Sequence, residues 1–252
     1  MTEKEAAAVE DVVLQATGLE KSFGHVRALA GGSLKLRRSE IMALVGDNGA
    51  GKSTLIKCLS GVLTPDAGAI ETGGKRYGRL TVPLARALGV AVVYQDLALA
   101  DHLDVAANIW LGAEPLKWGF FLDRARMIAD AEKLLARLSV RLTARGVPVG
   151  ALSGGQRQAV AAVRAIAQGG RILIMDEPTA AMGLREASHL LEVMAQLRDQ
   201  GLTLLCISHN LPQILQIADR VTVLRRGVTI REEPACGLDP LKLAGWMSGV
   251  LS

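Results

Sequence analysis

The sequence is poor in aromatic residues, in cysteine and in net charge, and each shortage excludes a class of protein. Aromatic residues make up 3% of the chain, too few for a protein that binds RNA or single-stranded DNA by base stacking. The net charge of +4 is mild and no long basic run occurs, so we expect no nucleic-acid partner. The three cysteines lie far apart and form no CxxC pair, which predicts neither a disulfide framework nor a zinc site and fits a reducing cytosol.

The sequence also lacks a recognisable targeting or membrane-spanning segment. Residues 1–11 are rich in Ala and Glu, lack the basic start and apolar core of a signal peptide, and are expected to form a flexible N-terminus. The longest uncharged stretch, residues 201–218, has Ser208, His209 and Pro212 in its middle, which argues against a membrane span. We therefore expect a soluble chain whose membrane contacts are made through a partner.

Half of the 252 residues are hydrophobic, enough for one large α/β domain or for a core with a smaller lobe. Short apolar runs predict strands at residues 12–17, 32–36, 41–45, 90–93, 172–175 and 203–207 and a hairpin of 220–224 with 228–231. Apolar residues at helical spacing predict helices after residue 54 and at residues 123–139, 153–167, 184–200 and 240–247. Residues 96–150 carry no convincing strand signal, so we predict a mostly helical lobe inserted between two halves of the core.

A glycine-rich motif, Gly46-x4-Gly51-Lys52-Ser53, joins a predicted strand to a predicted helix. Glycines let successive backbone amides point into one cavity, and the helix adds its positive N-terminal end, so the motif suits phosphate groups. Lys52 is expected to reach the β- and γ-phosphates, and the Ser53 hydroxyl to ligate Mg²⁺. The alternative is a Gly-rich turn without a ligand, which the flanking strand and helix disfavour.

A buried strand that ends in two carboxylates forms the second motif, residues 172–177. Such a strand places its last residues at the carboxyl edge of the sheet, where ligands bind in α/β folds. Asp176 is expected to hold Mg²⁺, mostly through water, and Glu177 to polarise a water for attack on the γ-phosphate. On this motif alone, a strand that ends in ordinary surface acids is an equal alternative.

A Ser-Gly-Gly turn opens a predicted helix in the third motif, residues 152–156. The free amides at the start of a helix bind anions, so the chain carries two anion-binding helix starts. A single nucleotide in one monomer would not obviously need both. A capped turn with no ligand is the alternative for this motif.

The three motifs, in this order, resemble those of the ATP-binding subunit of an ABC transporter. Residues 46–54 match its Walker A motif, residues 152–156 its signature and residues 172–177 its Walker B motif. The resemblance implies an α/β fold of the P-loop NTPase type, the ABC nucleotide-binding domain, with an N-terminal antiparallel β subdomain and an inserted helical subdomain. It implies one domain over residues 12–248, divided into core and β subdomain (12–95 and 151–248) and a helical subdomain (about 96–150).

The resemblance also implies the site residues. Gln95 matches the Q-loop glutamine, His209 the switch histidine and Phe23 the aromatic that stacks on adenine. The implied ATP-binding residues are Phe23, Gly46, Asp47, Asn48, Gly49, Ala50, Gly51, Lys52, Ser53 and Thr54. The residues implied to cover ATP on a partner chain are Leu152, Ser153, Gly154, Gly155 and Gln156. Mg²⁺ is implied at Ser53, Gln95 and Asp176, and the implied catalytic residues are Glu177, His209, Lys52 and Gln95.

Three segments, residues 94–99, 177–183 and 208–212, are similar to a narrower group, the import ATPases for simple sugars of the ribose, xylose, galactose and fructose type. Gly183 departs from the wider family, in which Asp is usual after Walker B, but the sugar group often shares this feature. Arg38-Ser39 replaces a common Pro-Gly turn, and Ala30 stands where Asp is common; neither is expected to touch the phosphates.

The resemblance further implies partners and a place in the cell. ATP would lie between two subunits, either two copies of this chain or this chain and a related ABC subunit. The helical lobe would dock a short cytoplasmic helix of a transmembrane permease, with residues 96–103 and the stretch around Trp110 as candidates for the groove. A solute-binding protein would be an indirect partner, and the chain would sit peripherally on the cytoplasmic face of the cell membrane.

Two questions stay open on sequence alone. Trp110, Trp118, Phe120 and Phe121 either pack in the core of the small lobe or form a partner surface. The main alternative to a sugar importer is an ABC ATPase for another solute or one without a transport role. A chromosome-type ATPase would carry a long coiled coil, and the 57 positions from Gln95 to Leu152 (152 − 95) are too few for one.

Overall fold

The computed structural model describes residues 12–143, 146–180 and 182–251. A six-stranded sheet occupies its centre, in the order β12 (Val228–Pro234), β11 (Arg220–Arg225), β3 (Ile41–Val45), β10 (Thr203–Ile207), β9 (Ile172–Asp176) and β6 (Val90–Val93). All neighbouring pairs are parallel except β11 with β12, which form the predicted hairpin. The expectation of a flexible segment at residues 1–11 concerns residues outside those described.

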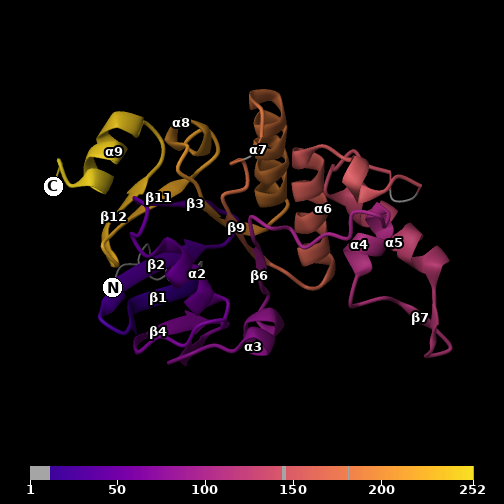
Figure 1. Ribbon diagram of the computed structural model, residues 1–252, viewed down its shortest axis with the longest axis horizontal. Helices are drawn as coiled ribbons and strands as arrows, with labels where there is room; N and C mark the ends of the chain where they lie inside the picture. Colours follow the sequence, from indigo (N-terminus) through magenta and orange to yellow (C-terminus); the bar gives the residue numbers. More distant parts are fainter. Residues whose placement is uncertain (1–11, 144–145, 181, 252) are drawn as a thin grey trace, which may run out of the picture.

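A second sheet of four antiparallel strands lies beside the first. Its order is β2 (Val26–Arg37), β1 (Val12–Phe23), β4 (Ala67–Thr72) and β5 (Lys75–Tyr77). The strands β1 and β2 are longer than the predicted runs, and β4 and β5 were not predicted. The helix α2 (Lys52–Leu59) packs on these strands, and α3 (Val82–Ala87) leads from β5 to β6 (Figure 1).

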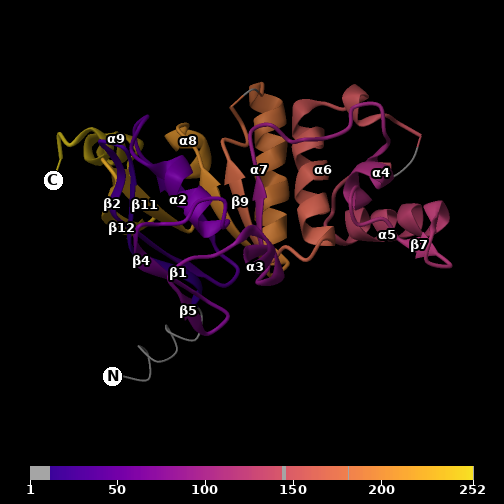
Figure 2. The ribbon, with the colours of Figure 1, turned by 60° about the horizontal axis from the view of Figure 1, so that its bottom comes forward.

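Helices cover the other side of the central sheet and form one end of the molecule. They are α4 (Val105–Trp110), α5 (Arg124–Arg137), α6 (Gly154–Ala167) and α7 (Leu184–Asp199), with a 3₁₀ turn at Val149–Ala151 before α6. The short α8 (Leu211–Ile214) and the C-terminal α9 (Pro240–Ser248) lie at the opposite end (Figures 1 and 2). None of the helices in the described ranges is long and apolar enough to cross a membrane.

The central sheet separates two hydrophobic cores. Successive side chains of a strand point to opposite faces, so in β3 Ile41, Ala43 and Val45 join one core while Met42 and Leu44 join the other. The first core includes α6 and α7, and the second includes α2 and the antiparallel sheet. Burial on both faces explains why the strands predicted best are short, uninterrupted apolar runs.

The predicted absence of strands between residues 96 and 150 is wrong in one place. Two-residue strands, β7 (Leu116–Lys117) and β8 (Phe121–Leu122), form a small hairpin that projects from the helical end in both views (Figures 1 and 2). Trp118 is 74% exposed and Phe120 71%, and Phe121 is also exposed, so these three aromatic residues do not pack in the core. Trp110 is half-buried, and its Nε1–H donates to the Met127 carbonyl at 3.0 Å.

Candidate functional site

The strand register gathers the polar motif residues at one edge of the central sheet. Val93 of β6 pairs with Met175 of β9, and Asp176 of β9 pairs with Ile207 of β10. In turn, Ile207 pairs with Leu44 of β3. Because these strands are parallel, the residues that follow each of them leave the sheet at the same edge. The predicted residues Gln95, Asp176, Glu177, His209 and the loop at 46–51 therefore come from four adjacent strand ends.

The loop between β3 and α2 has the shape of a phosphate-binding loop. Gly51 has φ of +103° and Gly49 of +81°, backbone conformations that residues with a Cβ rarely adopt. A Cβ on Gly51 would lie 2.5 Å from the Ala28 carbonyl oxygen, and one on Gly46 would lie 2.2 Å from that of Leu224. The loop is thus folded against the neighbouring chain in a way that only glycine permits. No side chain caps the N-terminus of α2, so its first-turn amides are available to an anion.

Lys52 lies inside this loop. It is 9% exposed, and its ammonium Nζ donates to the carbonyl oxygens of Gly46 at 2.6 Å and Asp47 at 3.0 Å. Burial lowers the pKa of Lys52, and the negative charges of Glu177, Asp47 and Asp176 oppose that shift. The side chain is therefore a buried cation with acidic neighbours, suited to neutralising the charge of a phosphate group.

The two carboxylates differ in conformation and surroundings. Asp176 ends β9, and burial raises its pKa, as does the charge of Glu177, while Lys52 lowers it. Glu177 has φ of +51°, in the left-handed region that non-glycine residues seldom occupy. Its N–H donates to the Ile207 carbonyl at 3.0 Å, which ties the residue to β10. The carboxylate is held at a turn where it leaves the sheet.

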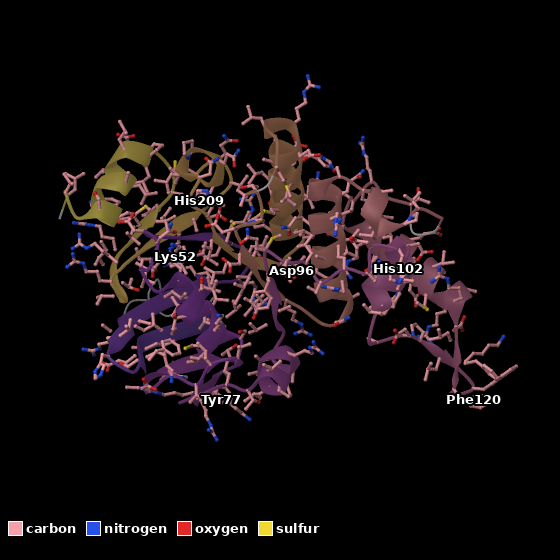
Figure 3. The ribbon with its side chains drawn as sticks, viewed as in Figure 1. Lys52, Tyr77, Asp96, His102, Phe120 and His209 are labelled. Carbon is pink, nitrogen blue, oxygen red and sulfur yellow. The ribbon has the colours of Figure 1, made fainter. Side chains whose placement is uncertain are left out.

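His209 reaches Glu177 from the loop after β10. Its Nδ1 lies 2.5 Å from Oε2 of Glu177, and its side chain is 65% exposed. Figure 3 shows His209 and Lys52 in the half of the molecule that holds the central sheet, whereas His102 lies among the helices. His25, His102 and His189 are exposed. Of the four histidines, His209 is the one that contacts a predicted site residue.

The donor set fits a nucleotide-bound Mg²⁺ better than an all-protein metal centre. Within the described ranges, no group of three or more His, Cys, Asp or Glu side chains is arranged to hold a metal ion. The Ser53 hydroxyl and the Asp176 carboxylate are hard oxygen donors beside the loop, which suits an ion that binds one or two protein groups together with phosphate oxygens and water. Gln95 and Phe23, which is 48% exposed, lie on the surface at strand ends.

The signature residues form the start of α6. Ser153 and Gln156 make a capping box, in which the Ser153 hydroxyl accepts from the Gln156 amide and Gln156 Oε1 accepts from the Ser153 amide. Leu152 is half-buried, and α6 packs against α4, α7 and β6. Among the described residues, residues 152–156 make no hydrogen bond or ion pair with the loop at 46–54, and α6 and α2 pack on opposite faces of the central sheet.

Two residues that hold the segment after Gln95 were not predicted from the sequence. Asn108 is fully buried, and Arg164 donates to two carbonyl groups of that segment. An arginine among the apolar residues 159–167 and a lone Asn within a short helical run were the available signals. Neither specifies a contact, because their partners are main-chain atoms, which for Arg164 lie 66 and 67 positions away in the sequence. Cys58 and Cys206 are buried and Cys236 is exposed.

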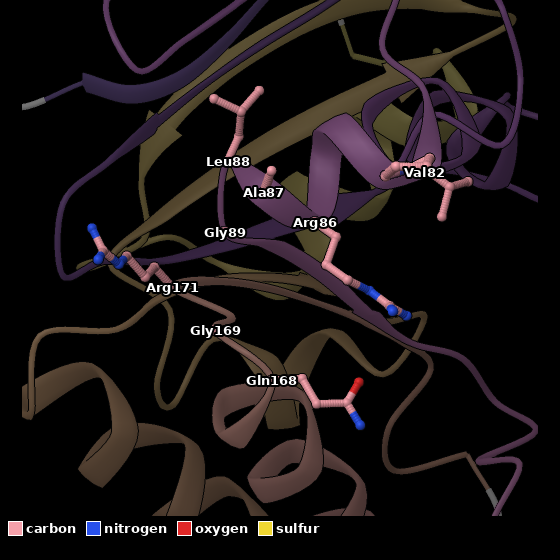
Figure 4. Close-up of a pocket in the computed structure, with 9 residues that line it drawn as sticks. Val82, Arg86, Ala87, Leu88, Gly89, Gln168, Gly169 and Arg171 are labelled. Atoms are coloured by element: carbon pink, nitrogen blue, oxygen red, sulfur yellow. The ribbon is translucent and has the colours of Figure 1, made fainter. Parts of the chain in front are cut away.

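Two of the cavities formed by the described residues lie away from the phosphate loop. One, of about 700 Å³, is lined by Val82, Arg86, Gln168 and Arg171 among others and lies at the start of β6 and β9, the opposite edge of the sheet (Figure 4). The second, of about 360 Å³, is lined by Val62, Tyr94, Leu111 and Arg164 among others. It lies between α3 with β6 on one side and α6 on the other. This second cavity therefore lies where the edge of the central sheet meets the helices.

Known proteins resemble this chain over most of its length. The sequence profile of the family described as "ABC transporter" matches residues 29–180. The fructose import ATP-binding protein FrcA of Rhizobium meliloti is 43% identical over 226 residues, which cover 86% of each chain. The xylose/arabinose import ATP-binding protein XylG of Sulfolobus acidocaldarius is 44% identical over 218 residues, again 86% of each. The ribose import ATP-binding protein RbsA of Chromobacterium violaceum is 41% identical, but this chain spans only 44% of its length.

Solved structures show the same fold. A nucleotide-free ATP-binding cassette from an ABC transporter superposes with a TM-score of 0.78 at 27% identity, over 88% of this chain and 91% of that one. The ADP conformation of MJ1267, an ATP-binding cassette of an ABC transporter, gives a TM-score of 0.76 at 25% identity, over 94% and 95% of the two chains. These likenesses agree with the fold class expected from the motifs.

Proposed function

The chain belongs to the ABC transporter family, and we propose that it is the ATP-binding and ATP-hydrolysing subunit of an importer for a simple sugar. The observation that carries the ATPase assignment is the gathering of Lys52, Asp176, Glu177 and His209 at one edge of the central sheet. The sugar assignment rests on relatives whose names include fructose, xylose and arabinose import, at 43% and 44% identity.

The chemistry of the site follows from its own residues. Lys52 and the amides at the start of α2 bind the phosphates, and Phe23 supplies a ring for the adenine. Ser53, Gln95 and Asp176 would hold Mg²⁺, which when bound would neutralise charge on the phosphate oxygens. Glu177 orients and deprotonates a water at the exposed side of the sheet edge. His209 holds the Glu177 carboxylate through the contact of Nδ1 with Oε2.

Two subunits are needed to use both anion-binding helix starts. We propose that ATP on the loop at 46–54 of one subunit is covered by residues 152–156 of a second, either a copy of this chain or a related subunit. The separation of α6 from the loop within one chain supports this arrangement. Closure of the two subunits would bring the positive N-terminal ends of α2 in one subunit and of α6 in the other to the same phosphate. Loss of the γ-phosphate would remove that attraction.

The permease contact is proposed at the helical end. The 360 Å³ cavity between core and helices exposes Tyr94 and Leu111 beside the segment that begins at Gln95, and a short cytoplasmic helix of a transmembrane permease would fill it. This extends the expected groove of residues 96–103 and Trp110 toward the core. The subunit would then sit on the cytoplasmic face of the membrane, and a solute-binding protein would choose the sugar outside it.

The deciding experiment compares the wild type with Glu177→Gln. We expect the variant to bind ATP with unchanged affinity and to lose turnover by at least about a hundredfold, because a general base contributes that much or more. Glu192→Gln, on the exposed face of α7, is the matched control and should keep full activity. Equal turnover in Glu177→Gln and the wild type would overturn the role of Glu177. For the sugar assignment, co-purification with a permease and uptake of radiolabelled fructose, xylose and ribose provide the test.

A further inference from the structure

The segment that follows Gln95 is attached to the signature helix by an arginine. Arg164, near the end of α6, donates from Nη1 to the Ala98 carbonyl at 2.8 Å and from Nη2 to the Leu97 carbonyl at 2.7 Å. A planar guanidinium that bonds two consecutive carbonyl groups fixes both the position and the orientation of that peptide unit. The chain bends at residues 95–96, just after β6, and we call this bend the Gln95 turn. Gln95 stands only two residues before Leu97, so the contact lies directly at the exit of the turn.

The peptide that Arg164 holds is in an unfavourable conformation. Ala98 has φ of +47°, in the left-handed region, although it carries a Cβ. Its N–H donates to Asp96 Oδ1 at 3.1 Å, and its carbonyl accepts from Arg164. Bonds on both sides of the residue therefore maintain a turn that the chain would not adopt unaided. The turn lies three residues after Gln95 and directs the chain from there toward the helices.

Arg164 is dedicated to these carbonyl groups. It is half-buried, burial lowers the pKa of its guanidinium, and no carboxylate pairs with it in the part of the chain that the structure describes. A buried charge without an ionic partner needs its dipolar partners, so losing the two carbonyl groups would be costly. Arg164 also lines the 360 Å³ cavity together with Tyr94 and Leu111. An occupant of that cavity therefore meets the same guanidinium.

Two further contacts attach the rest of the segment to the helices. Arg157, the residue directly after the signature, donates to Asp101 Oδ1 at 2.6 Å. Asn108 of α4 accepts from the Ala100 amide at 2.8 Å and donates to the Ala100 carbonyl at 3.1 Å. These contacts attach the segment to α4 and α6, whereas Gln95 itself follows a strand of the core. Arg164 is the tie closest to that boundary.

We propose that Arg164 is a positioning residue that joins the exit of the Gln95 turn to the signature helix α6, so that a displacement of one displaces the other. The inference rests on the proposed function, because it assumes that Gln95 and residues 152–156 act on nucleotide. Arg164 touches none of the expected ATP-binding residues. Its loss should therefore impair turnover and spare the binding of ATP.

The test compares Arg164→Met and Arg164→Lys with the control Arg137→Met in the full-length chain. Arg137 ends α5, is exposed, and makes no hydrogen bond or ion pair among the described residues. We expect Arg164→Met to lower kcat for ATP by about tenfold or more, as a small displacement of a catalytic group can do, with KM within twofold of the wild type. Arg164→Lys should recover part of kcat, because a lysine can reach one carbonyl but not clamp two.

Amide exchange measured by mass spectrometry provides the second readout. Arg164→Met should speed exchange in residues 96–101 and leave α7 and the central sheet unchanged, and Arg137→Met should change neither. Equal kcat in Arg164→Met and Arg137→Met would overturn the proposal. If Arg164→Met speeds amide exchange throughout the protein, Arg164→Lys is the variant that decides. A wild-type kcat for Arg164→Lys would also overturn the proposal. An inactive wild type would instead refute the proposed function, while the exchange comparison would still test the clamp.

Discussion

The imidazole of His209 and the carboxylate of Glu177 are in direct contact, with Nδ1 2.5 Å from Oε2. The two residues follow neighbouring parallel strands, and the Glu177 amide donates to Ile207 at the end of the strand that carries His209. Glu177 is also left-handed at φ +51°, a conformation that costs roughly 1–2 kcal/mol. The Glu177 carboxylate, the group most suited to activate water, is thus held both by the backbone of Glu177 and by the contact with His209.

Replacing His209 should therefore harm turnover more than binding. We expect His209→Ala to lower kcat by about tenfold to a hundredfold, because the Glu177 carboxylate loses the group that orients it. The affinity for ATP, measured by equilibrium binding with Mg²⁺ present, should stay within a few-fold of the wild type. His189→Ala is the control, since His189 is exposed on α7 and pairs with Glu192, away from the predicted site residues. Loss of ATP affinity matching the loss of kcat would contradict the orienting role.

Asp176 gives the site a pH dependence with a definite sign. Burial and the neighbouring Glu177 raise the pKa of Asp176 above its ordinary value, so the carboxylate takes up a proton at a higher pH than a free Asp does. Mg²⁺-dependent ATP binding should weaken as pH falls through this raised pKa. Glu177→Gln removes one of the two causes and should move that weakening to lower pH. ATP affinity measured across pH in both proteins, with circular dichroism to confirm folding, tests the shift.

The same raised pKa has a consequence for stability. A carboxyl group whose pKa is raised in the folded state contributes stability below its unfolded pKa and loses that contribution as pH rises through the folded pKa. At pH 7 the ionised Asp176 is therefore unfavourable for folding. We expect Asp176→Asn to raise Tm at pH 7 while abolishing ATPase activity, and the gain in Tm to shrink as pH is lowered. A lower Tm for the variant at pH 7 would show that Asp176 is stabilised by partners after all.

The glycine at the start of α2 offers a test of the loop geometry. Gly51→Ala places a methyl group 2.5 Å from the Ala28 carbonyl oxygen at φ of +103°, so the loop must shift. We expect ATP affinity to fall by at least about tenfold and stability by about 1–3 kcal/mol. Gly183→Ala is the matched control, because its methyl group meets no atom within 4 Å and its φ is negative. Unchanged ATP affinity in Gly51→Ala would mean that the loop does not cradle the phosphates.

The sequence predicted the buried strands and the site edge better than it predicted the surface of the fold. Residues 41–45, 172–175 and 203–207 are apolar and uninterrupted, and tertiary packing on both faces reinforces their local preference. In β1 and β2, glycines such as Gly18 and Gly31 interrupt the alternation, so only fragments of the long strands were predicted. The two-residue strands of the aromatic hairpin are too short to give any periodic signal.

Contacts between distant residues lay beyond the sequence. The motif order indicated that Glu177 and His209 share a site, but the touching of their side chains depends on the register of β9 with β10. The bonds of Arg164 go to main-chain oxygens, which every residue possesses, so no residue type in the sequence points to them. The site residues were therefore predictable as a set, and the ties that orient them were not.

A buried ion pair at the far end of β3 should control stability independently of the site. Arg220 pairs with Glu40, which is 5% exposed, and with Glu232 on the hairpin. Burial raises the pKa of Glu40, and Arg220 and the Arg37 amide oppose the shift. Arg220→Met should cost about 3–5 kcal/mol of unfolding free energy at pH 7.5, because it leaves Glu40 buried without its partner.

The unfolding free energy lost in Arg220→Met should become smaller as pH falls. Without Arg220 the pKa of Glu40 rises further, so lowering the pH protonates the stranded carboxyl and removes the penalty. Urea unfolding at pH 7.5 and 5.5 should thus show a smaller difference from the wild type at the lower pH. The double variant Glu40→Gln/Arg220→Met is the control, and its deficit should depend less on pH. If the loss of unfolding free energy in Arg220→Met does not change with pH, the loss comes from altered packing and not from the stranded charge.

Trp118 provides a direct optical test of the helical end. Of the three tryptophans, Trp246 is 4% exposed and Trp110 is half-buried, whereas Trp118 is 74% exposed at the tip of the hairpin. Acrylamide should therefore quench the wild type strongly, and Trp118→Phe should remove most of the quenchable, red-shifted emission while Trp110→Phe leaves it. If the hairpin forms part of the permease contact, co-purified complex should show Trp118 protected from acrylamide and its emission shifted to the blue, because the indole leaves water. Emission that stays fully quenchable in the complex would show that the hairpin lies outside the permease contact.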